Sequence, residues 1–354
     1  MKRRDLLIGT AGLAATSQIK AANKEVYKWK MVTTWPPNFP GLGTGAMGMA
    51  KNIEKASGGR IKIKVFAGGE LVPAFESFDF VSSGGAEMGH GAAYYWRGKS
   101  EATQVFTTLP FGLNAMELNG WLYYGGGMEL YRELYEPFNL RPYPAGNSGC
   151  QMGGWFKKPI NSIEDLQGLK MRIPGFGGEV LRRNGGTPVA MPGSEIFTAL
   201  QTGTIDAAEW IGPYNDLTFG FHKVAKHYYY PGWHEGGPAL ECIVNKEAYE
   251  ELPEDLQTII DIAASATNDT MLAEFVARNA FSLKQIEMME DIKIAPFPKD
   301  VMDAFKQKAE EIIAEIITKD PVFAKIYKSF SEYKNTVEKW TKISEYALLQ
   351  NRYE

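Results

Sequence analysis

Two short segments of the chain place carboxylates beside tryptophans and helix-breaking residues. Residues 207–215 read AAEWIGPYN, and residues 231–237 read PGWHEGG. Glu209 and Trp210, like Trp233 and Glu235, therefore stand next to Gly and Pro, which favour tight turns over regular surface helices. This placement indicates parts of a site rather than a solvated polar face.

A pair of carboxylates can serve either hydrolysis or cation binding. A hydrolase that uses Glu209 and Glu235 is one hypothesis, because glycosidases work with paired carboxylates. However, no wall of sugar-binding residues can be identified in the sequence. Binding fits better, because the two carboxylates, a backbone carbonyl between them and the amide oxygen of Gln151 would form a cage of hard oxygens. Such a cage suits Ca²⁺ or Na⁺ rather than a thiophilic metal.

Arg172 is the candidate for an anionic ligand. It lies in KMRIPG, just after a predicted strand and just before a proline turn. From a strand end its guanidinium could reach a cleft and clamp a carboxylate with two parallel hydrogen bonds; the alternative is an ordinary surface arginine. The charges also balance, since two carboxylates offset a divalent cation and Arg172 offsets an anion.

Other chemistry finds little support in the sequence. There is no GxSxG, CxxC or HExxH pattern, and the glycines at 41–45 and 175–178 lack the spacing and Lys of a phosphate loop. The net charge of −4 and the lack of a basic stripe argue against nucleic-acid binding. Cys150 and Cys242 do not make a disulfide framework, and the sequence does not decide whether they pair.

The first residues have the design of a secretory signal. In MKRRDLLIGTAGLAATSQIKAAN, a basic start precedes an apolar stretch from Leu6 to Ala15 and then small residues. The stretch is too short to span a bilayer. The adjacent Arg3 and Arg4 suggest a twin-arginine signal, which exports folded proteins; the alternative is a short cytosolic tail. We therefore expect residues 1–22 to be a signal peptide, and the mature protein to be exported and soluble.

The order of elements predicts an α/β fold with two domains. Strands are expected at 26–35 and 60–71 with a helix at 44–59 between them, and a helix followed by a buried strand at 75–96. A second α/β unit begins near residue 150. We expect domain I at 23–150 plus about 238–290 and domain II at 151–237, with a ligand in the cleft between them.

The C-terminal third is predicted to be helical, with a last segment at 291–354. One helix there carries a stripe of apolar residues at spacings of three and four, which ends at Ile343 or Ser344. The stripe consists of Phe323, Ile326, Phe330, Tyr333, Val337 and Trp340. It could pack within the chain, or it could bind a second copy of the chain as a dimerisation element.

Several phrases resemble the substrate-binding proteins of tripartite ATP-independent periplasmic (TRAP) transporters. They run along the whole mature chain: WPPNFPGLGTGA at 35–46, GAAYYWRGK at 91–99, PFGLNAMELNGWLYYGGG at 110–127, GLKMRIPGFGGEV at 168–180, GTIDAAEWIGPYND at 203–216 and PGWHE at 231–235. The EWIGP and WHE phrases are similar to the branch that binds 2-oxo and 2-hydroxy monocarboxylates, such as pyruvate and lactate, with a metal ion. The resemblance implies a two-domain periplasmic binding-protein fold with a hinge cleft and long C-terminal helices.

The resemblance also implies roles for individual residues. Arg172 would bind the ligand carboxylate, and Gln151 would contact both ligand and metal. Glu209, the backbone oxygen of Trp210 and Glu235 would hold a Ca²⁺ or Na⁺ ion. The turns would then aim both carboxylates at one ion, while the tryptophan rings exclude water.

Two further side chains, Tyr95 and Phe39, are expected to line the pocket. Many relatives place an Asn that assists the arginine at about residues 191–193, and this chain has Met-Pro-Gly there. That departure matches the metal-using branch and leaves the assisting group unidentified.

Three functions follow as hypotheses. The favoured one is a non-enzymatic receptor in the periplasm that delivers a metal-bound 2-oxo or 2-hydroxy acid to TRAP permease subunits, and that dimerises through its C-terminal helix. The alternatives are the hydrolase and a sensor subunit with the same ligand. Turnover of the ligand would separate the first two.

Overall fold

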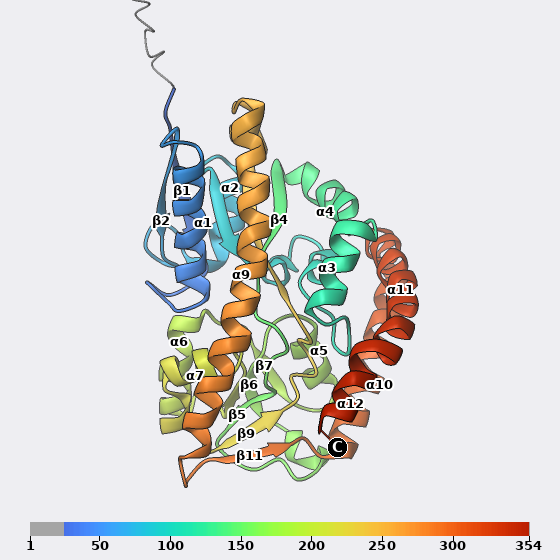
Figure 1. The fold of residues 1–354 in the computed structure, drawn as a ribbon. Helices are drawn as coiled ribbons and strands as arrows, with labels where there is room; N and C mark the ends of the chain where they lie inside the picture. The colour runs from blue at the N-terminus through green and yellow to red at the C-terminus, as the bar shows by residue number, and fades with distance from the viewer. Residues whose placement is uncertain (1–24, 354) are drawn as a thin grey trace, which may run out of the picture.

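The computed structural model describes residues 25–353, which form two α/β lobes joined by several chain crossings (Figure 1). The expected signal at 1–22 lies outside this range. Within residues 25–353, no helix combines the length and the apolar character needed to cross a membrane. Cys150 and Cys242 are both free thiols, and Cys242 is buried in a strand.

The first lobe is built on a five-stranded sheet in the order β2-β1-β3-β10-β4. Its strands are β1 (Tyr27–Thr33), β2 (Ile61–Phe66), β3 (Met88–Gly91), β4 (Leu140–Asn147) and β10 (Ala239–Asn245). The first three strands are parallel, and β10 runs antiparallel to both β3 and β4. The predicted strands at 26–35 and 60–71 are confirmed as β1 and β2.

Helices cover this sheet and lead the chain between its strands (Figure 1). They are α1 (Leu42–Ala56), α2 (Ser77–Ser82), α3 (Ala115–Tyr124), α4 (Gly127–Tyr135) and α8 (Lys246–Glu250), with 3₁₀ turns η1 (Ala74–Glu76), η2 (Ala93–Trp96), η3 (Glu101–Phe106) and η4 (Glu136–Phe138). The predicted helix at 44–59 is confirmed as α1. A capping box fixes the start of α3, where Asn114 and Glu117 each bind the other's backbone N–H.

The second lobe contains a six-stranded sheet in the order β11-β9-β5-β8-β6-β7. Its elements are β5 (Gly154–Phe156), η5 (Ile163–Leu166), β6 (Lys170–Arg172), α5 (Gly175–Arg183), β7 (Thr187–Val189), α6 (Gly193–Thr202), β8 (Ala207–Ala208), α7 (Pro213–Phe219), η6 (Phe221–Lys223), β9 (His227–Tyr230) and β11 (Lys293–Pro296). The sequence did not predict β11, which pairs in parallel with β9. The prediction that residues 291–354 form helices is therefore wrong for β11. A strand of four residues gives too short a pattern to recognise in the sequence.

Three segments cross between the lobes before the last helices. Residues 148–153 lead from β4 to β5, and residues 231–238 lead from β9 back to β10. The long helix α9 (Glu254–Glu287) packs against α1 and β4 of the first lobe and against α7 of the second. It runs almost the full height of the molecule (Figure 1). Each crossing therefore passes close to the boundary at which a ligand is expected.

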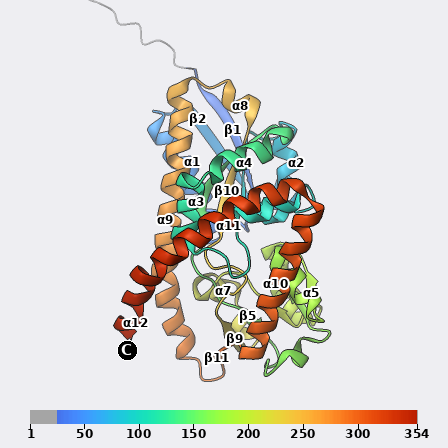
Figure 2. The ribbon, with the colours of Figure 1, turned by 90° about the vertical axis from the view of Figure 1, so that its right-hand side faces the viewer.

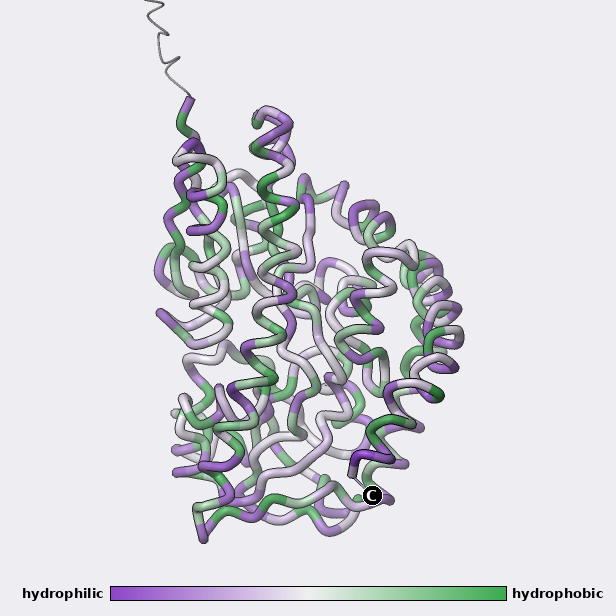
Figure 3. Tube along the Cα trace, viewed as in Figure 1, coloured by the Kyte–Doolittle hydropathy of each residue, from purple (hydrophilic) through white to green (hydrophobic). Residues whose placement is uncertain are grey.

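The final helices wrap around one side of the molecule (Figure 2). Helix α10 (Lys299–Lys319) packs against α5, and α11 (Pro321–Thr341) returns to α3 and α4 of the first lobe. A π-helical turn (Lys342–Tyr346) and α12 (Ala347–Tyr353) follow. Figure 3 shows hydrophobic and hydrophilic residues alternating along these helices, as expected for helices with one buried face.

The apolar stripe of α11 divides into two parts. Phe323, Ile326 and Phe330 are buried in a hydrophobic cluster with residues of both lobes, and Tyr333 and Val337 pack partly against it. Trp340, in contrast, is 65% exposed. Packing within the chain therefore accounts for most of the stripe. Its predicted end near Ile343 coincides with the π-helical turn, which shifts the helical phase.

Candidate functional site

Backbone hydrogen bonds hold the two irregular crossings side by side. The N–H of Gln151 donates to the carbonyl of Glu235 at 3.1 Å, and the N–H of Gly232 donates to the carbonyl of Gln151 at 2.8 Å. A side chain at Gly232 would collide with the Gln151 backbone, so glycine permits this close approach. The N–H of Met152 donates to the carbonyl of Ile211 at 2.9 Å. These bonds bring Gln151, Glu235 and the loop after β8 together.

Arg172 enters the same region from the end of β6. Strand β6 pairs in parallel with β8, and the N–H of Glu209 donates to the Arg172 carbonyl at 3.2 Å. The guanidinium donates from Nη1 to the carboxylate and, at 3.1 Å, to the carbonyl of Glu209. Its Nε donates to the carbonyl of Met191 at 3.4 Å, so a backbone oxygen supports the arginine at the position where relatives were expected to use Asn. Arg172 also lies over the ring of Trp210, 4.9 Å from its centroid.

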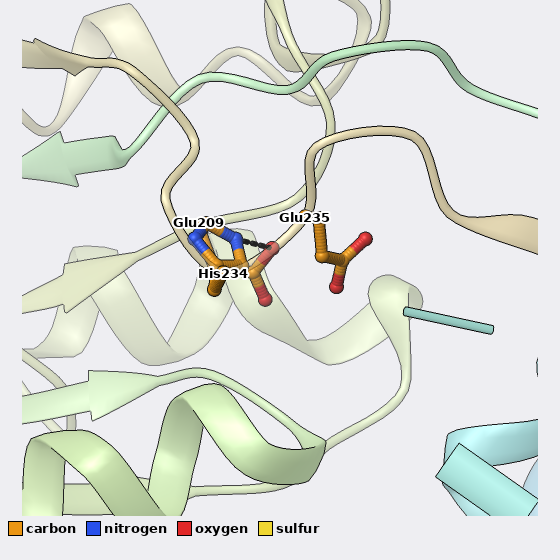
Figure 4. Close-up of side chains that lie close together, drawn as sticks. All are labelled: Glu209, His234 and Glu235. Atoms are coloured by element: carbon orange, nitrogen blue, oxygen red, sulfur yellow. Dashed lines mark hydrogen bonds and ion pairs between the residues drawn. The ribbon is translucent and has the colours of Figure 1, made fainter. Parts of the chain in front are cut away.

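Glu209, His234 and Glu235 form a compact buried cluster (Figure 4). Each offers one ligand atom, and these atoms all lie within 4.8 Å of one another. His234 Nε2 lies 3.2 Å from Oε2 of Glu209. Because a carboxylate can only accept, we assign the proton to Nε2, and His234 then holds one oxygen of Glu209 in place.

The electrostatics of the cluster favour an added cation. Burial and then the negative charge of Glu209 raise the pKa of Glu235 well above its usual value, while Arg172 and the Tyr94 hydroxyl oppose the rise. Burial acts to lower the pKa of Arg172. Nearby negative charge, above all that of Glu209, outweighs burial and raises this pKa above its usual value. Two carboxylates face one guanidinium, so the charge of the cluster is negative when both are ionised.

The donor atoms fit a hard cation. Within residues 25–353, Oε1 of Gln151 and Oε2 of Glu235 are buried without a hydrogen-bond partner, and the N–H of Gln151 donates to the carbonyl of Glu235. Together with Glu209 they supply the oxygen ligands that Ca²⁺ and Na⁺ prefer. Imidazole suits softer metals, which assigns His234 to orienting Glu209 rather than to ligation.

A small cavity lies between the lobes beside the cluster. Its volume is about 10 Å³, which is room for about one water molecule. Its lining combines aromatic, aliphatic and polar side chains from both lobes and from the crossings: Trp35, Leu42, Tyr94, Tyr95, Gln151, Trp210, Ile211 and Leu240.

A buried histidine fixes the orientation of Trp35, which lines this cavity. The indole N–H of Trp35 donates to Nδ1 of His90 at 2.8 Å, and His90 Nε2 lies 2.9 Å from the carbonyl of Ala145. His90 is therefore the neutral Nε2–H tautomer, and burial lowers its pKa to about 4. Trp35 meets Trp210 of the other lobe edge to face, with ring centroids 6.4 Å apart.

The structure separates the expected site residues into groups. Gln151, Arg172, Glu209 and Glu235 lie together with Trp210, and Tyr95 lines the cavity. Phe39 lies outside the cavity lining; it stacks on Phe219 at 4.3 Å and meets Trp210 at 6.1 Å, so it supports the Trp210 ring from behind.

The two tryptophans beside the expected carboxylates lie in different places. The ring of Trp233 stacks on Phe305 of α10, with centroids 4.2 Å apart, and does not line the cavity. The second tryptophan of the cavity is Trp35, which the sequence reasoning passed over. It also gave no role to His234, although this residue stands directly before Glu235 in the WHE phrase.

Comparison with known proteins identifies the family. The sequence profile of bacterial extracellular solute-binding protein family 7 (DctP) matches residues 31–320. The chain belongs to this family. The chain is also 42% identical to the Monocarboxylate 2-oxoacid-binding periplasmic protein of Nostoc sp., over 98% of this chain and 97% of the relative.

Solved structures of TRAP periplasmic solute-binding proteins share the fold of this family 7 chain. The protein of Colwellia psychrerythraea, with bound calcium and pyruvate, is 46% identical with a TM-score of 0.90, over 92% of this chain and 100% of that chain. That of Pseudoalteromonas atlantica, with bound sodium and pyruvate, is 45% identical with a TM-score of 0.90, over 92% and 99%. A Bordetella bronchiseptica protein, a dimer with calcium and picolinate, is 40% identical with a TM-score of 0.91, over 93% and 98%. The resemblance to TRAP receptors and the two-domain fold are confirmed.

Proposed function

We propose that this family 7 protein is an exported receptor that binds a 2-oxo or 2-hydroxy monocarboxylate, such as pyruvate or lactate, together with Ca²⁺ or Na⁺. It would deliver this ligand in the periplasm to the membrane subunits of a TRAP permease. The observation that carries the proposal is the buried Arg172 beside Glu209 and Glu235, next to a cavity between two lobes. The relatives that bind 2-oxo acids with calcium or sodium support it.

The residues take the following roles under this proposal. Arg172 binds the ligand carboxylate, and Gln151 contacts both ligand and cation. Glu209, the carbonyl of Trp210 and Glu235 hold the cation, which would screen the ligand's charge from the two carboxylates. With Ca²⁺ and a monocarboxylate, the charges of the ion and Arg172 cancel those of the ligand and the two glutamates, as burial of such groups requires.

We also propose that the protein binds its ligand without converting it. The two oxygens of Glu209 accept hydrogen bonds from Arg172 and His234, which supports a role in binding for this carboxylate. NMR spectra of pyruvate before and after incubation with the protein test this point. Loss of pyruvate over time would favour the hydrolase or another enzyme.

The direct test is calorimetry with pyruvate, with and without Ca²⁺ or Na⁺, on chelator-treated protein. Arg172→Ala should weaken pyruvate binding by about 30-fold or more, because deletion of one partner of a buried charge pair costs about 2–5 kcal/mol. Arg182→Ala is the matched control, since that arginine is exposed and, within residues 25–353, forms an ion pair with Glu179 alone. Equal affinities of the two variants would refute the assignment of Arg172.

A dimer through the C-terminal helix is the second proposal. After Trp340 the helix exposes Ile343, Leu348 and Tyr353, each at least 68% accessible, and one relative with a solved structure is a dimer. Large exposed apolar residues so close together along the chain favour a partner surface. Analytical ultracentrifugation should show a dimer for the intact chain and a monomer for Trp340→Ser/Ile343→Ser. A monomeric intact chain at micromolar concentration would refute this proposal.

A further inference from the structure

The hydrogen bonds of Arg172 leave little of its guanidinium for a ligand. Of its five N–H groups, one on Nε points to the Met191 carbonyl, and two on Nη1 reach the carbonyl and the carboxylate of Glu209. One on Nη2 reaches the hydroxyl of Tyr95 at 3.5 Å. The side chains of Arg172 and Glu209 are 1% and 0% exposed, so water does not substitute for these contacts.

This arrangement places Glu209 in competition with a ligand carboxylate. A carboxylate that pairs with two parallel hydrogen bonds needs Nη2 together with either Nη1 or Nε. Nε is directed to Met191 and Nη1 to Glu209, and only Glu209 has a side chain that can turn elsewhere. A two-point ligand therefore displaces Oε1 of Glu209 from Nη1.

Both oxygens of Glu209 accept hydrogen bonds, and the same residue is a proposed ligand of the cation. Oε1 binds Arg172, and Oε2 lies 3.2 Å from His234 Nε2. Oε2 of Glu235, which has no hydrogen-bond partner within residues 25–353, belongs to a carboxylate of the same cluster. A hard cation beside Glu235 would therefore compete with Arg172 and His234 for the oxygens of Glu209.

We propose that Glu209 exchanges between Arg172 and the cation, so that occupation of the cation site makes Arg172 available to the ligand carboxylate. The inference rests on the proposed function and adds a coupling within the chain to it. Without a cation, the ligand has to displace Glu209 and leave its buried carboxylate without the charge of Arg172, which is costly. With a cation, Glu209 turns from Arg172 while His234 keeps its other oxygen in place. Cation and ligand then raise each other's affinity through Glu209, in addition to any direct contact between them.

Glu209→Gln gives the decisive comparison, because it removes the competing charge while it keeps the shape. Pyruvate binding is measured by calorimetry in choline buffer with EGTA, which excludes Na⁺ and Ca²⁺. Without cations, the variant should bind pyruvate about tenfold more tightly than the unsubstituted protein, since a charge-assisted hydrogen bond no longer opposes the ligand. Calcium should then add little to its affinity.

Glu235→Gln is the matched control. It makes the same substitution at the other carboxyl group of the cluster, but it leaves the Arg172–Glu209 pair in place. Without cations, its gain in pyruvate affinity should be several-fold smaller than the gain of Glu209→Gln. Equal gains would show that the contact of Glu209 with Arg172 plays no special part and would overturn the exchange. The absence of any gain in Glu209→Gln, with its fold verified by circular dichroism, would also overturn it.

A measurement on the unsubstituted protein tests the exchange independently of how the variants fold. In protein labelled with ¹⁵N-arginine, the Arg172 resonance is assigned by its loss in Arg172→Lys. Calcium alone, without pyruvate, should shift this resonance, because Glu209 leaves the guanidinium. An unmoved Arg172 signal at calcium saturation would overturn the inference. If the unsubstituted protein fails to bind pyruvate even with Ca²⁺ or Na⁺, the proposed function itself fails, which is a separate outcome.

Discussion

Glu241 is a buried carboxylate outside the ligand site, and it should make the stability of the protein depend on pH. It lies on β10, where it accepts hydrogen bonds from the Trp96 indole and the Tyr131 hydroxyl. Within residues 25–353, no Lys or Arg forms an ion pair with it. Burial raises the pKa of Glu241 from 4.5 to about 7, although hydrogen bonds from Tyr131 and Trp96 act in the opposite direction.

The direction of the effect follows from proton binding in the two states. The unfolded chain releases this proton near pH 4.5, whereas the folded protein retains it until about pH 7. Between these values the folded state binds more protons, so the free energy of unfolding falls as the pH rises. Each tenfold difference in proton affinity corresponds to about 1.4 kcal/mol. The free energy of unfolding therefore falls by a total of about 3 kcal/mol because of Glu241.

Glu241→Gln should remove this loss. Glutamine can accept from the Trp96 N–H and donate to the Tyr131 oxygen, as the protonated carboxyl group does. Urea unfolding at pH 5 and pH 8 measures the free energy of unfolding of the variant, the unsubstituted protein and the exposed control Glu290→Gln. The fall between the two pH values should be about 2.5 kcal/mol smaller in Glu241→Gln alone, because a part of the effect is already present at pH 5. The same fall in all three proteins would refute the reasoning.

Two further predictions concern the site. Leu240→Ala enlarges the aliphatic side of the cavity, so the affinity for 2-oxovalerate relative to pyruvate should rise by about tenfold in calorimetry; an unchanged ratio would place the ligand's carbon chain elsewhere. His234→Ala removes the partner of Glu209 Oε2, and the affinity for Ca²⁺ should fall by about tenfold or more in a competition assay with a fluorescent chelator. Unchanged calcium affinity would show that His234 does not stabilise the calcium site.

The sequence reveals features whose signal is local. Period-two alternation is sufficient to predict β1 and β2, and helical periodicity is sufficient to predict α9. Glu209 and Glu235 could be singled out because each stands beside Trp, Gly or Pro in a short phrase. In each case the residues that carry the signal are near neighbours in the chain.

The features that the sequence did not reveal depend on contacts between distant residues. Trp35 becomes a cavity wall because His90, 55 positions away, holds its indole N–H. Trp233 turns away from the cavity because Phe305 of α10 offers it a stacking partner. Neither partnership leaves a pattern in spacing or composition, so only the folded chain shows which tryptophan faces the site.

The loop that carries Trp210 also joins the two lobes, which links ligand binding to closure under the proposed function. The Trp210 indole N–H donates to Asn215 Oδ1 at 3.2 Å, and Asn215 Nδ2 donates to the carbonyl of Pro40 in the first lobe at 3.0 Å. Arg172 reaches Tyr95 of the first lobe in the same way. A ligand and cation held by Arg172 and the Trp210 carbonyl would therefore fix the groups that make these contacts across the boundary. Because a ligand shifts an equilibrium only by its differential affinity for the two states, these shared residues are the physical means by which binding favours the closed form.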